Sequence, residues 1–369
     1  MMNKLLIKLL VFITVAGLLS IIVYILISQI PQPPSNDVKK AQIALSKAYK
    51  SKAHTFSKEL YQEAKADYDS AMVNWRKQNT KFIYFRKYDK VSKFAKLSLK
   101  VSGKAIETST SNSNSYQTKL KDKVASLEKL IGDINSYFDR YPLPREIRIS
   151  ISKGKMMYEE GLIEYKNGQL ITATTKLNQA DDLLSSVYDK AYTDLEQYLR
   201  SFPIWKKWTE MAINESKENQ TYSIVVDKLS RKCFVYFNGA KKYEFDVELG
   251  RNWVGDKLRM GDKATPEGKY KIISKFSGTK YNNALLLDYP NEEDRKRFYK
   301  EKARGTIPSY AKIGGGIEIH GSGGKGVDWT EGCIALEDSE MNLIFRLASI
   351  GTPVTIVGST KNINQIFTR

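Results

Sequence analysis

The chain has 369 residues, 41% of them hydrophobic, and a formal net charge of +18. This length predicts two or three domains, and the hydrophobic content excludes a chain that is disordered throughout. The charge divides into +12 before Lys217 and +6 from Lys217 onward. A basic surface attracts anionic polymers in general, so charge alone leaves nucleic acid, anionic lipid and a carboxylate-bearing cell wall open.

Residues 1–30 predict a transmembrane signal anchor. The segment from Leu9 to Ile27 contains no charged residue, and Lys4 and Lys8 precede it. Its 19 residues are about the length that crosses a bilayer as a helix, and the lysines favour leaving the N-terminus in the cytoplasm. The alternative, a cleaved signal peptide, would have a shorter apolar stretch and a small-residue cleavage site. Either reading places residues 35–369 outside the cytoplasm, on the wall side of a single-pass membrane protein, and argues against nucleic acid as a partner.

Residues 31–37 contain three prolines and predict a stiff linker. Residues 38–215 predict a helical region, because apolar side chains recur at helical spacing, most clearly from Leu170 to Leu199. A bundle of five or six helices is expected, and a protein partner of this region is left open. Breaks are expected at Asn79-Thr80, Thr108–Ser115, Pro142–Pro144, Asn167-Gly168 and Pro203.

Residues 220–358 predict a mainly β domain, because the apolar period changes from 3.6 to 2 at Thr221. Asn238-Gly239 between two apolar runs is a strong hairpin signal. Two helices are expected, at Asn291–Lys302 and Ser339–Ser349, and residues 359–369 form a tail. Strands are expected at Tyr222–Asp227, Lys232–Phe237, Lys242–Leu249, Gly268–Ile273, Leu285–Asp288, Ile317–His320 and Pro353–Val357. The predicted fold class is therefore a multidomain α+β protein.

The chain has two cysteines, Cys233 and Cys333. In an exported protein a disulfide is one reading of such a pair. The sequence contexts differ, however. Cys233 lies among Phe and Val in the predicted hairpin and is expected to be a small apolar core residue. Cys333 follows Gly332 in a glycine-rich segment that also contains His320.

The segment from Gly314 to Leu336 is the candidate for chemistry. A phosphate-binding loop would need a Gly-Lys-Ser/Thr ending, which is missing. A zinc site would need three or four ligands, and only His320 and Cys333 are available, so no metal is expected. A nucleophilic cysteine needs a base, and His320 is the only histidine outside the helical region. Gly332 leaves room for the N–H groups of residues 332 and 333 to face an oxyanion.

These motifs resemble the L,D-transpeptidase catalytic domain of the YkuD type. The resemblance rests on His320-Gly321, the glycine-rich loop, and Thr330-Glu331-Gly332-Cys333-Ile334, and it covers roughly residues 220–358. Upstream, Ala264–Tyr270 resembles the strand entry Thr-Pro-x-Gly-x-Tyr, and Gly351–Val354 resembles the final strand. Two positions depart from the commoner pattern: Glu331 replaces a histidine and Ala335 replaces an arginine that would hold a carboxylate. This resembles an offshoot that includes members acting on wall cross-links or wall-bound proteins.

The resemblance implies a ping-pong acyl transfer on peptidoglycan stem peptides without a cofactor. Cys333 would attack the carbonyl of the third stem residue, and His320 would act as general base. Gly332, Gly321, Ser322, Thr330 and Glu331 are expected to form the oxyanion and substrate positions, with Glu331 directed toward a cationic amine. The acyl group would pass to an amine or to water. The rival reading is a wall-binding scaffold with an inactive site, against which the presence of both Cys333 and His320 argues.

Overall fold

The computed structural model describes residues 2–139 and 141–367. Helix α1 (Met2–Ser28) has no acidic residue in its first turn and no basic residue in its last turn. Its segment Lys4–Ser28 is long and apolar enough to cross a membrane, judged by length and composition. Pro31, Pro33 and Pro34 then interrupt helical structure before α2 begins at Ser35.

Helices make up the chain from α2 to α8. Apolar and small residues at three- and four-residue intervals form their buried stripes, as in Val38, Ala41, Ala44 and Ala48 of the first of them. The helices are α2 (Ser35–Lys50), α3 (Ala53–Phe56), α4 (Lys58–Asn79), α5 (Asp89–Phe138), α6 (Arg145–Lys166), α7 (Leu170–Leu199) and α8 (Phe202–Glu218), with the 3₁₀ turn η1 (Ile83–Phe85) between α4 and α5.

The predicted break at Thr108–Ser115 is wrong, because α5 runs through it without interruption. The polar side chains of this run are hydrogen-bonded instead of competing with the helix. Thr110 Oγ1 donates to Ile106 O at 2.9 Å, and Ser109 Oγ donates to Ser51 O at 2.7 Å. The other four predicted breaks all coincide with helix ends.

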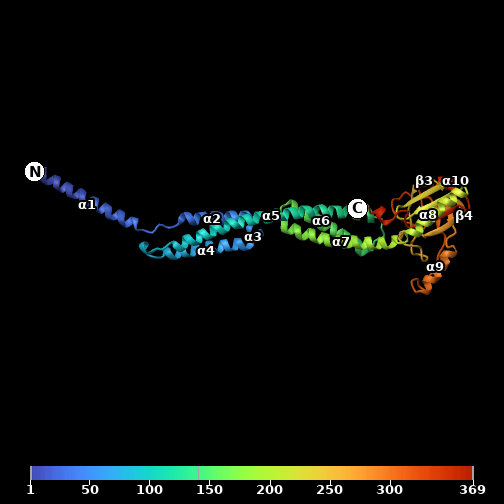
Figure 1. Cartoon of the computed structure of the whole chain (residues 1–369), viewed down its shortest axis with the longest axis horizontal. Coiled ribbons are helices and arrows are strands. Elements are labelled where there is room, and N and C mark those ends of the chain that lie inside the picture. Colours follow the sequence, from blue (N-terminus) through green and yellow to red (C-terminus); the bar gives the residue numbers. More distant parts are fainter. Residues whose placement is uncertain (1, 140, 368–369) are drawn as a thin grey trace. The chain divides into compact units, whose positions relative to one another are not determined.

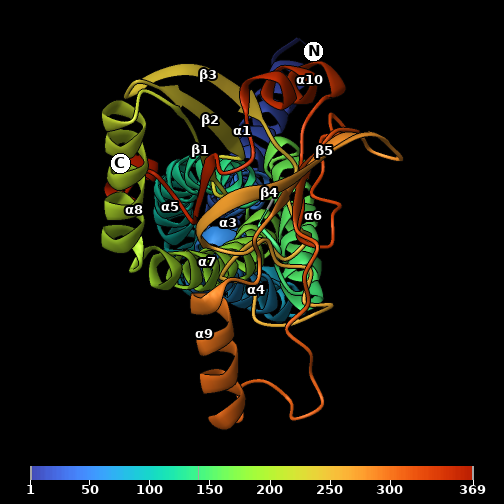
Figure 2. The same cartoon turned by 90° about the vertical axis from the view of Figure 1, so that its right-hand side faces the viewer.

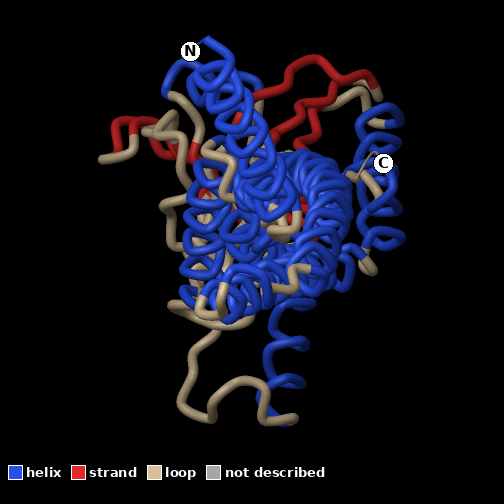
Figure 3. Tube along the Cα trace, turned by 90° about the vertical axis from the view of Figure 1, so that its left-hand side faces the viewer, coloured by secondary structure: helices blue, strands red, loops and turns tan. Residues whose placement is uncertain are grey.

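Within the described residues the first strand begins at Tyr222. Figure 3 shows the strands in red and the helices in blue. Eight of them form one sheet in the order β3-β2-β1-β8-β4-β5-β6-β7. Their bounds are β1 (Tyr222–Asp227), β2 (Lys232–Phe237), β3 (Ala240–Asp246), β4 (Gly268–Thr279), β5 (Asn282–Leu287), β6 (Glu318–His320), β7 (Ile334–Ala335) and β8 (Pro353–Val357). The β2–β3 turn has positive φ at Asn238 and Gly239, as predicted for that pair.

The sheet is curled, because its two ends are linked. The backbone of Glu248, just after β3, exchanges hydrogen bonds of 2.9 and 2.8 Å with Ala335 of the edge strand β7. Three further helices accompany the sheet: α9 (Glu292–Ala303), α10 (Asp338–Leu347) and α11 (Ile363–Ile366). Helix α9 and the loop after it extend away from the sheet (Figure 2). The predicted α+β class is therefore confirmed, with an apolar N-terminal helix and a C-terminal curled sheet.

Both cysteines are free thiols, so the disulfide alternative is wrong. Cys233 is fully buried in the core of the sheet beside Val226 and Val235. Burial raises the pKa of its thiol to about 12. This environment fits the predicted role of a small core residue.

The chain divides into two compact units. One comprises residues 1–124 and 162–174, and the other residues 125–161 and 175–369. Figure 1 labels the helices of both units. The second unit thus contains the sheet together with α8 and most of α6 and α7. Helices α5, α6 and α7 each contribute residues to both units.

Inside the second unit, helices pack directly on the sheet. Trp205 of α8 is 2% exposed and contacts Gly358, where a Cβ atom would overlap its ring. Tyr198 of α7 donates a hydrogen bond of 2.6 Å to Glu267 Oε1, and the same oxygen accepts from Lys228 Nζ at 2.8 Å. These contacts make α7 and α8 part of the core that supports the site.

Candidate active site

His320 ends β6 and is held between two neighbouring strands. It pairs with Ala284 of β5 and with Ala335 of β7, and it is 2% exposed. Its ring stacks on Tyr281, with centroids 4.5 Å apart, and meets Trp329 edge-on at 5.8 Å. These aromatic contacts define the plane of the imidazole.

The tautomer of His320 follows from its backbone contact. Nδ1 lies 2.7 Å from Gly321 O, and a carbonyl oxygen can only accept a hydrogen bond. Nδ1 therefore carries the proton, and Nε2 presents a lone pair. This is the arrangement that a general base requires.

Cys333 lies immediately before β7, which runs parallel to β6. The register pairs Ile319 with Ile334 and His320 with Ala335. Because side chains alternate along a strand, Cys333, two residues before Ala335, falls on the same face as His320. The Cys333 side chain is partly exposed, and Sγ lies 3.7 Å from Gly316 O. The structure thus brings the two residues to neighbouring strands with an accessible thiol.

Thr330, Gly332 and Cys333 form a tight turn. Thr330 Oγ1 donates to Cys333 O at 2.8 Å and accepts from the Gly332 N–H at 3.2 Å. The predicted oxyanion role of the Gly332 N–H is therefore not seen here, since that group already has an acceptor. Gly332 has φ +133°, and a Cβ atom there would lie 2.6 Å from Ala264 O, so glycine is required.

The remaining predicted positions are arranged around this turn. A Cβ atom on Gly321 would lie 2.8 Å from Tyr281 O, so its absence permits close packing. Ser322 has φ +63°, and its N–H donates to Asp338 Oδ1 at 2.8 Å. Glu331 has a 63% exposed side chain, 4.0 Å from Lys263 Nζ. The amine that Glu331 faces in the structure is therefore one of the chain's own.

Burial keeps both catalytic candidates uncharged. Desolvation is the largest effect on Cys333 and raises the pKa of its thiol, while a backbone hydrogen bond from Glu318 and the charge of Lys257 oppose that rise. Desolvation also lowers the pKa of His320, and the positive charges of Lys325 and Lys280 lower it further. These pKa shifts favour a neutral thiol and a neutral imidazole over a preformed ion pair.

Comparison with known proteins identifies this region. Residues 221–356 match the YkuD family, described as the L,D-transpeptidase catalytic domain. This part of the chain is a YkuD domain. The match confirms the resemblance inferred from the motifs around His320 and Cys333. It does not cover the helical region before residue 221. A search of curated proteins found no match for the chain.

Solved structures similar to this chain include three from different bacteria. Bd1075 of Bdellovibrio bacteriovorus is 23% identical over 40% of this chain and 53% of its own, with a TM-score of 0.29. An L,D-transpeptidase from Stackebrandtia nassauensis is 16% identical over 38% and 56%, with a TM-score of 0.26. L,D-transpeptidase 1 of Mycobacterium tuberculosis is 15% identical over 37% and 62%, with a TM-score of 0.25. The chain thus spans little more than half the length of these proteins.

Two acidic residues that the sequence did not single out fasten the loop of the YkuD domain between His320 and Cys333. Glu248 is buried and accepts from the Gly326 N–H and from Trp329 Nε1, both at 2.6 Å. Asp328 accepts from the Leu249 N–H at 3.0 Å and forms a 2.9 Å ion pair with Arg231. Of these positions only Trp329 had a local signal, since it directly precedes Thr330.

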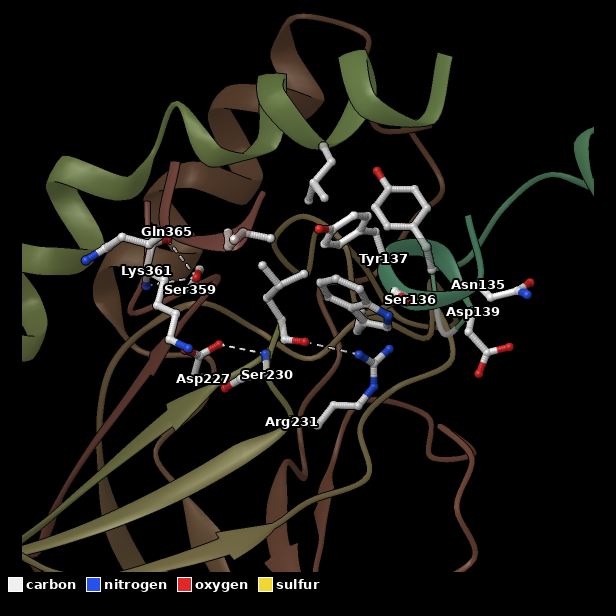
Figure 4. Close-up of a pocket in the computed structure, with 15 residues that line it drawn as sticks. Asn135, Ser136, Tyr137, Asp139, Asp227, Ser230, Arg231, Ser359, Lys361 and Gln365 are labelled. Carbon is white, nitrogen blue, oxygen red and sulfur yellow. Dashed lines mark hydrogen bonds between the residues drawn. The ribbon is translucent and has the colours of Figure 1, made fainter. Parts of the chain in front are cut away.

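A cavity of about 410 Å³ in the second unit lies where the end of α5 meets the β1–β2 turn (Figure 4). Figure 4 shows Arg231 at its wall, hydrogen-bonded to Leu229 O at 3.2 Å. The Arg231 guanidinium also packs over the Trp253 ring, 4.8 Å from its centroid. Arg231 also forms the ion pair with Asp328, so the cavity lies next to a contact that fastens the loop between His320 and Cys333. Neither His320 nor Cys333 lines the cavity.

Proposed function

We propose that the chain is a peptidoglycan-modifying cysteine acyltransferase whose nucleophile is Cys333 and whose general base is His320. The observation that carries the proposal is the tautomer of His320. Its Nδ1–H is directed at Gly321 O, which leaves Nε2 free to accept the thiol proton. The YkuD match over residues 221–356 supports the choice of stem peptides as substrate.

In the first half-reaction, Cys333 Sγ attacks the carbonyl carbon of the third stem residue while His320 Nε2 takes the thiol proton. A bond from sulfur to carbon forms, and negative charge develops on the carbonyl oxygen. The Cys333 N–H is the donor we assign to that oxygen, since the Gly332 N–H bonds to Thr330. Collapse breaks the carbon–nitrogen bond, and the leaving amine takes the proton back from His320.

In the second half-reaction an acceptor attacks the thioester and releases Cys333. An amine acceptor gives a cross-link or an attachment, and water gives a shortened stem or a released protein. The alanine at position 335 is the reason why we propose hydrolysis as a second outcome. It is fully buried, and its backbone pairs with Glu248, so position 335 offers no group to hold a carboxylate. Glu331 is the residue we assign to a cationic amine of the substrate.

We further propose that α1 anchors the protein in the cytoplasmic membrane, with all later residues on the wall side. The support is its length and apolar composition, together with the lysines at its N-terminal end. A YkuD domain acting on the wall requires that side of the membrane.

The test is incubation of the full chain with purified wall fragments, followed by mass spectrometry. We expect new 3→3 cross-links, shortened stems or released protein, each of which selects one outcome of the second half-reaction. Cys333→Ser is the control and should abolish all three products. Unchanged fragments with a folded wild-type protein, together with binding of the fragments, would support the scaffold reading instead.

A further inference from the structure

The turn between α4 and α5 exposes aromatic side chains to an unusual degree. Phe82 and Phe85 are 66% and 70% exposed, and their ring centroids lie 5.9 Å apart. The Tyr84 ring lies 5.8 Å from that of Phe82. Single exposed apolar residues are ordinary, but a contiguous aromatic group at a loop tip indicates a contact surface.

The turn is held rigidly in this shape. Arg86 donates to Lys81 O at 3.1 Å and to Asn79 O at 3.3 Å, which closes the loop across its base. The Lys87 N–H donates to Gln78 Oε1 at 3.0 Å. The two phenylalanines are therefore presented outward by a braced backbone, which lowers the cost of ordering the turn when they make a contact.

The turn lies at the end of the bundle where α2 begins (Figure 1). Tyr88, directly after the turn, is buried in the same cluster as Val38 of α2. Ser92 Oγ donates to Asp37 Oδ2 at 2.6 Å, which joins the first turns of α5 and α2. The aromatic turn therefore neighbours the start of α2.

The start of α2 is joined to α1 by a short linker. Only residues 29–34 separate the end of α1 at Ser28 from the start of α2 at Ser35. Six residues span at most about 20 Å even when fully extended. If α1 enters a membrane, the start of α2 therefore lies close to the surface of that membrane.

The charge of the turn fits an anionic surface. Residues 76–90 carry six cationic side chains and one acidic side chain, Asp89. Lys77, Lys81 and Lys87 are all exposed beside the aromatic group. Aromatic rings favour the headgroup level of a bilayer, and lysines beside them are attracted to anionic headgroups.

We infer that the turn Lys81–Lys87 is a second membrane contact, in which Phe82 and Phe85 enter the outer interface of an anionic bilayer and the flanking lysines bind its headgroups. The inference rests on the proposed membrane insertion of α1. The inference gives the helical region, which lies outside the YkuD match, a lipid surface as its partner. Two points of attachment, α1 and this turn, then hold the first compact unit at the bilayer.

The test uses the full chain in vesicles of phosphatidylcholine and anionic phosphatidylglycerol. An environment-sensitive fluorophore is attached at Phe82→Cys in a Cys333→Ser background, where Cys233 is buried and unreactive. The control is Tyr49→Cys, because Tyr49 is also an exposed aromatic residue (57%) but lies at the opposite end of α2. We expect nitroxide-labelled lipids to quench the probe at 82 several-fold more than the probe at 49.

The lysine contribution is measured with Lys81→Glu and Lys87→Glu together, which should reduce the quenching at 82 in anionic vesicles. Equal, weak quenching at 82 and 49 in protein that floats with the vesicles would overturn the inference while leaving the α1 anchor intact. Protein that fails to float would contradict the anchor itself. A probe at 82 that ignores lipid but responds to soluble wall fragments would assign the turn to the wall and overturn the proposal.

Discussion

The acid–base balance of the active site depends on two side chains that are both uncharged at rest. Burial raises the pKa of Cys333 and lowers the pKa of His320, so the thiol keeps its proton and the imidazole carries only the proton on Nδ1. In the proposed mechanism, attack therefore requires proton transfer to Nε2 as the sulfur–carbon bond forms. The aromatic rings of Tyr281 and Trp329 contact the imidazole and define its plane.

The pH dependence follows from the same directions. His320 must be neutral to act, so activity is lost as the pH falls through its lowered pKa. We expect the acid limb of the kcat/KM profile to lie below about 6.5, the ordinary histidine value. Without the base, Cys333 must ionise unaided, so alkylation of His320→Ala should be slow at neutral pH and should accelerate only above about pH 9. An acid limb above 7 would contradict the desolvated, neutral histidine.

Gly332 offers a test of the turn that carries Cys333. Gly332→Ala places a methyl group against Ala264 O and should displace the Cys333 N–H, lowering kcat/KM by about 10²-fold with product formation as the measurement. Gly326→Ala is the matched control on the same loop. Gly326 also has positive φ, at +74°, but no atom lies within 4 Å of its added Cβ. Equal losses in the two variants would mean that backbone strain alone is responsible.

At the scale of single residues, the sequence predicted candidate site residues that lie close together in the chain. It did not predict the residues that reach the site from other segments. His320, Gly332 and Cys333 lie in one segment whose residue types indicate the proposed chemistry. Tyr281 comes from the β4–β5 turn and Glu248 from the segment after β3, and neither has a motif of its own. Their roles depend on the curled sheet, which brings these segments together only after folding.

At the scale of elements, the helices α7 and α8 belong with the sheet that carries the site. Lys228 is completely buried and donates to Gly255 O at 2.6 Å and Thr265 O at 2.8 Å, as well as to Glu267. The segment between those two carbonyls includes Ala264, whose oxygen faces Gly332. Tyr198 of α7 completes the hydrogen bonding of Glu267, so a helix outside the YkuD match supports the wall of the active site.

Tyr198→Phe removes that hydrogen bond and keeps the ring. Because it leaves a buried carboxylate oxygen with one donor fewer, we expect the free energy of unfolding of the second unit to fall by about 1–3 kcal/mol. Urea denaturation measures the change. The control is Tyr192→Phe on the same helix, whose ring stacks on Tyr188, and it should cost less than about 0.5 kcal/mol. A loss as large in the control would show that general packing of α7, not the Glu267 contact, is responsible.

The elements themselves were largely predictable. Long stripes at a period of 3.6 identified the helices, and alternation with Asn238-Gly239 identified the first hairpin. Two failures have physical causes. The polar run in α5 keeps helical structure because its side chains bond to helix carbonyls and to the end of α2. Strand β7 has two residues, too few for any periodic signal.

At the scale of the whole molecule, the chain combines an apolar helix, helical bundles and a curled sheet. The uncharged apolar run, the prolines and the change of apolar period were the basis of the predicted domain series, and the YkuD match lies inside the predicted range 220–358. The extent of each compact unit was not predictable in the same way. Helical periodicity identifies a buried face but not the element that covers it, as Trp205 against Gly358 illustrates.

The contrast between the two thiols has a consequence for the molecule as a whole. Cys233 is sealed in the core of the sheet, whereas Cys333 reaches solvent. A native molecule thus offers one site to an alkylating reagent, and a molecule whose sheet has opened offers two. The number of labels per chain, measured by mass spectrometry, therefore gives the fraction of molecules whose sheet has opened. The measurement requires no added reporter group.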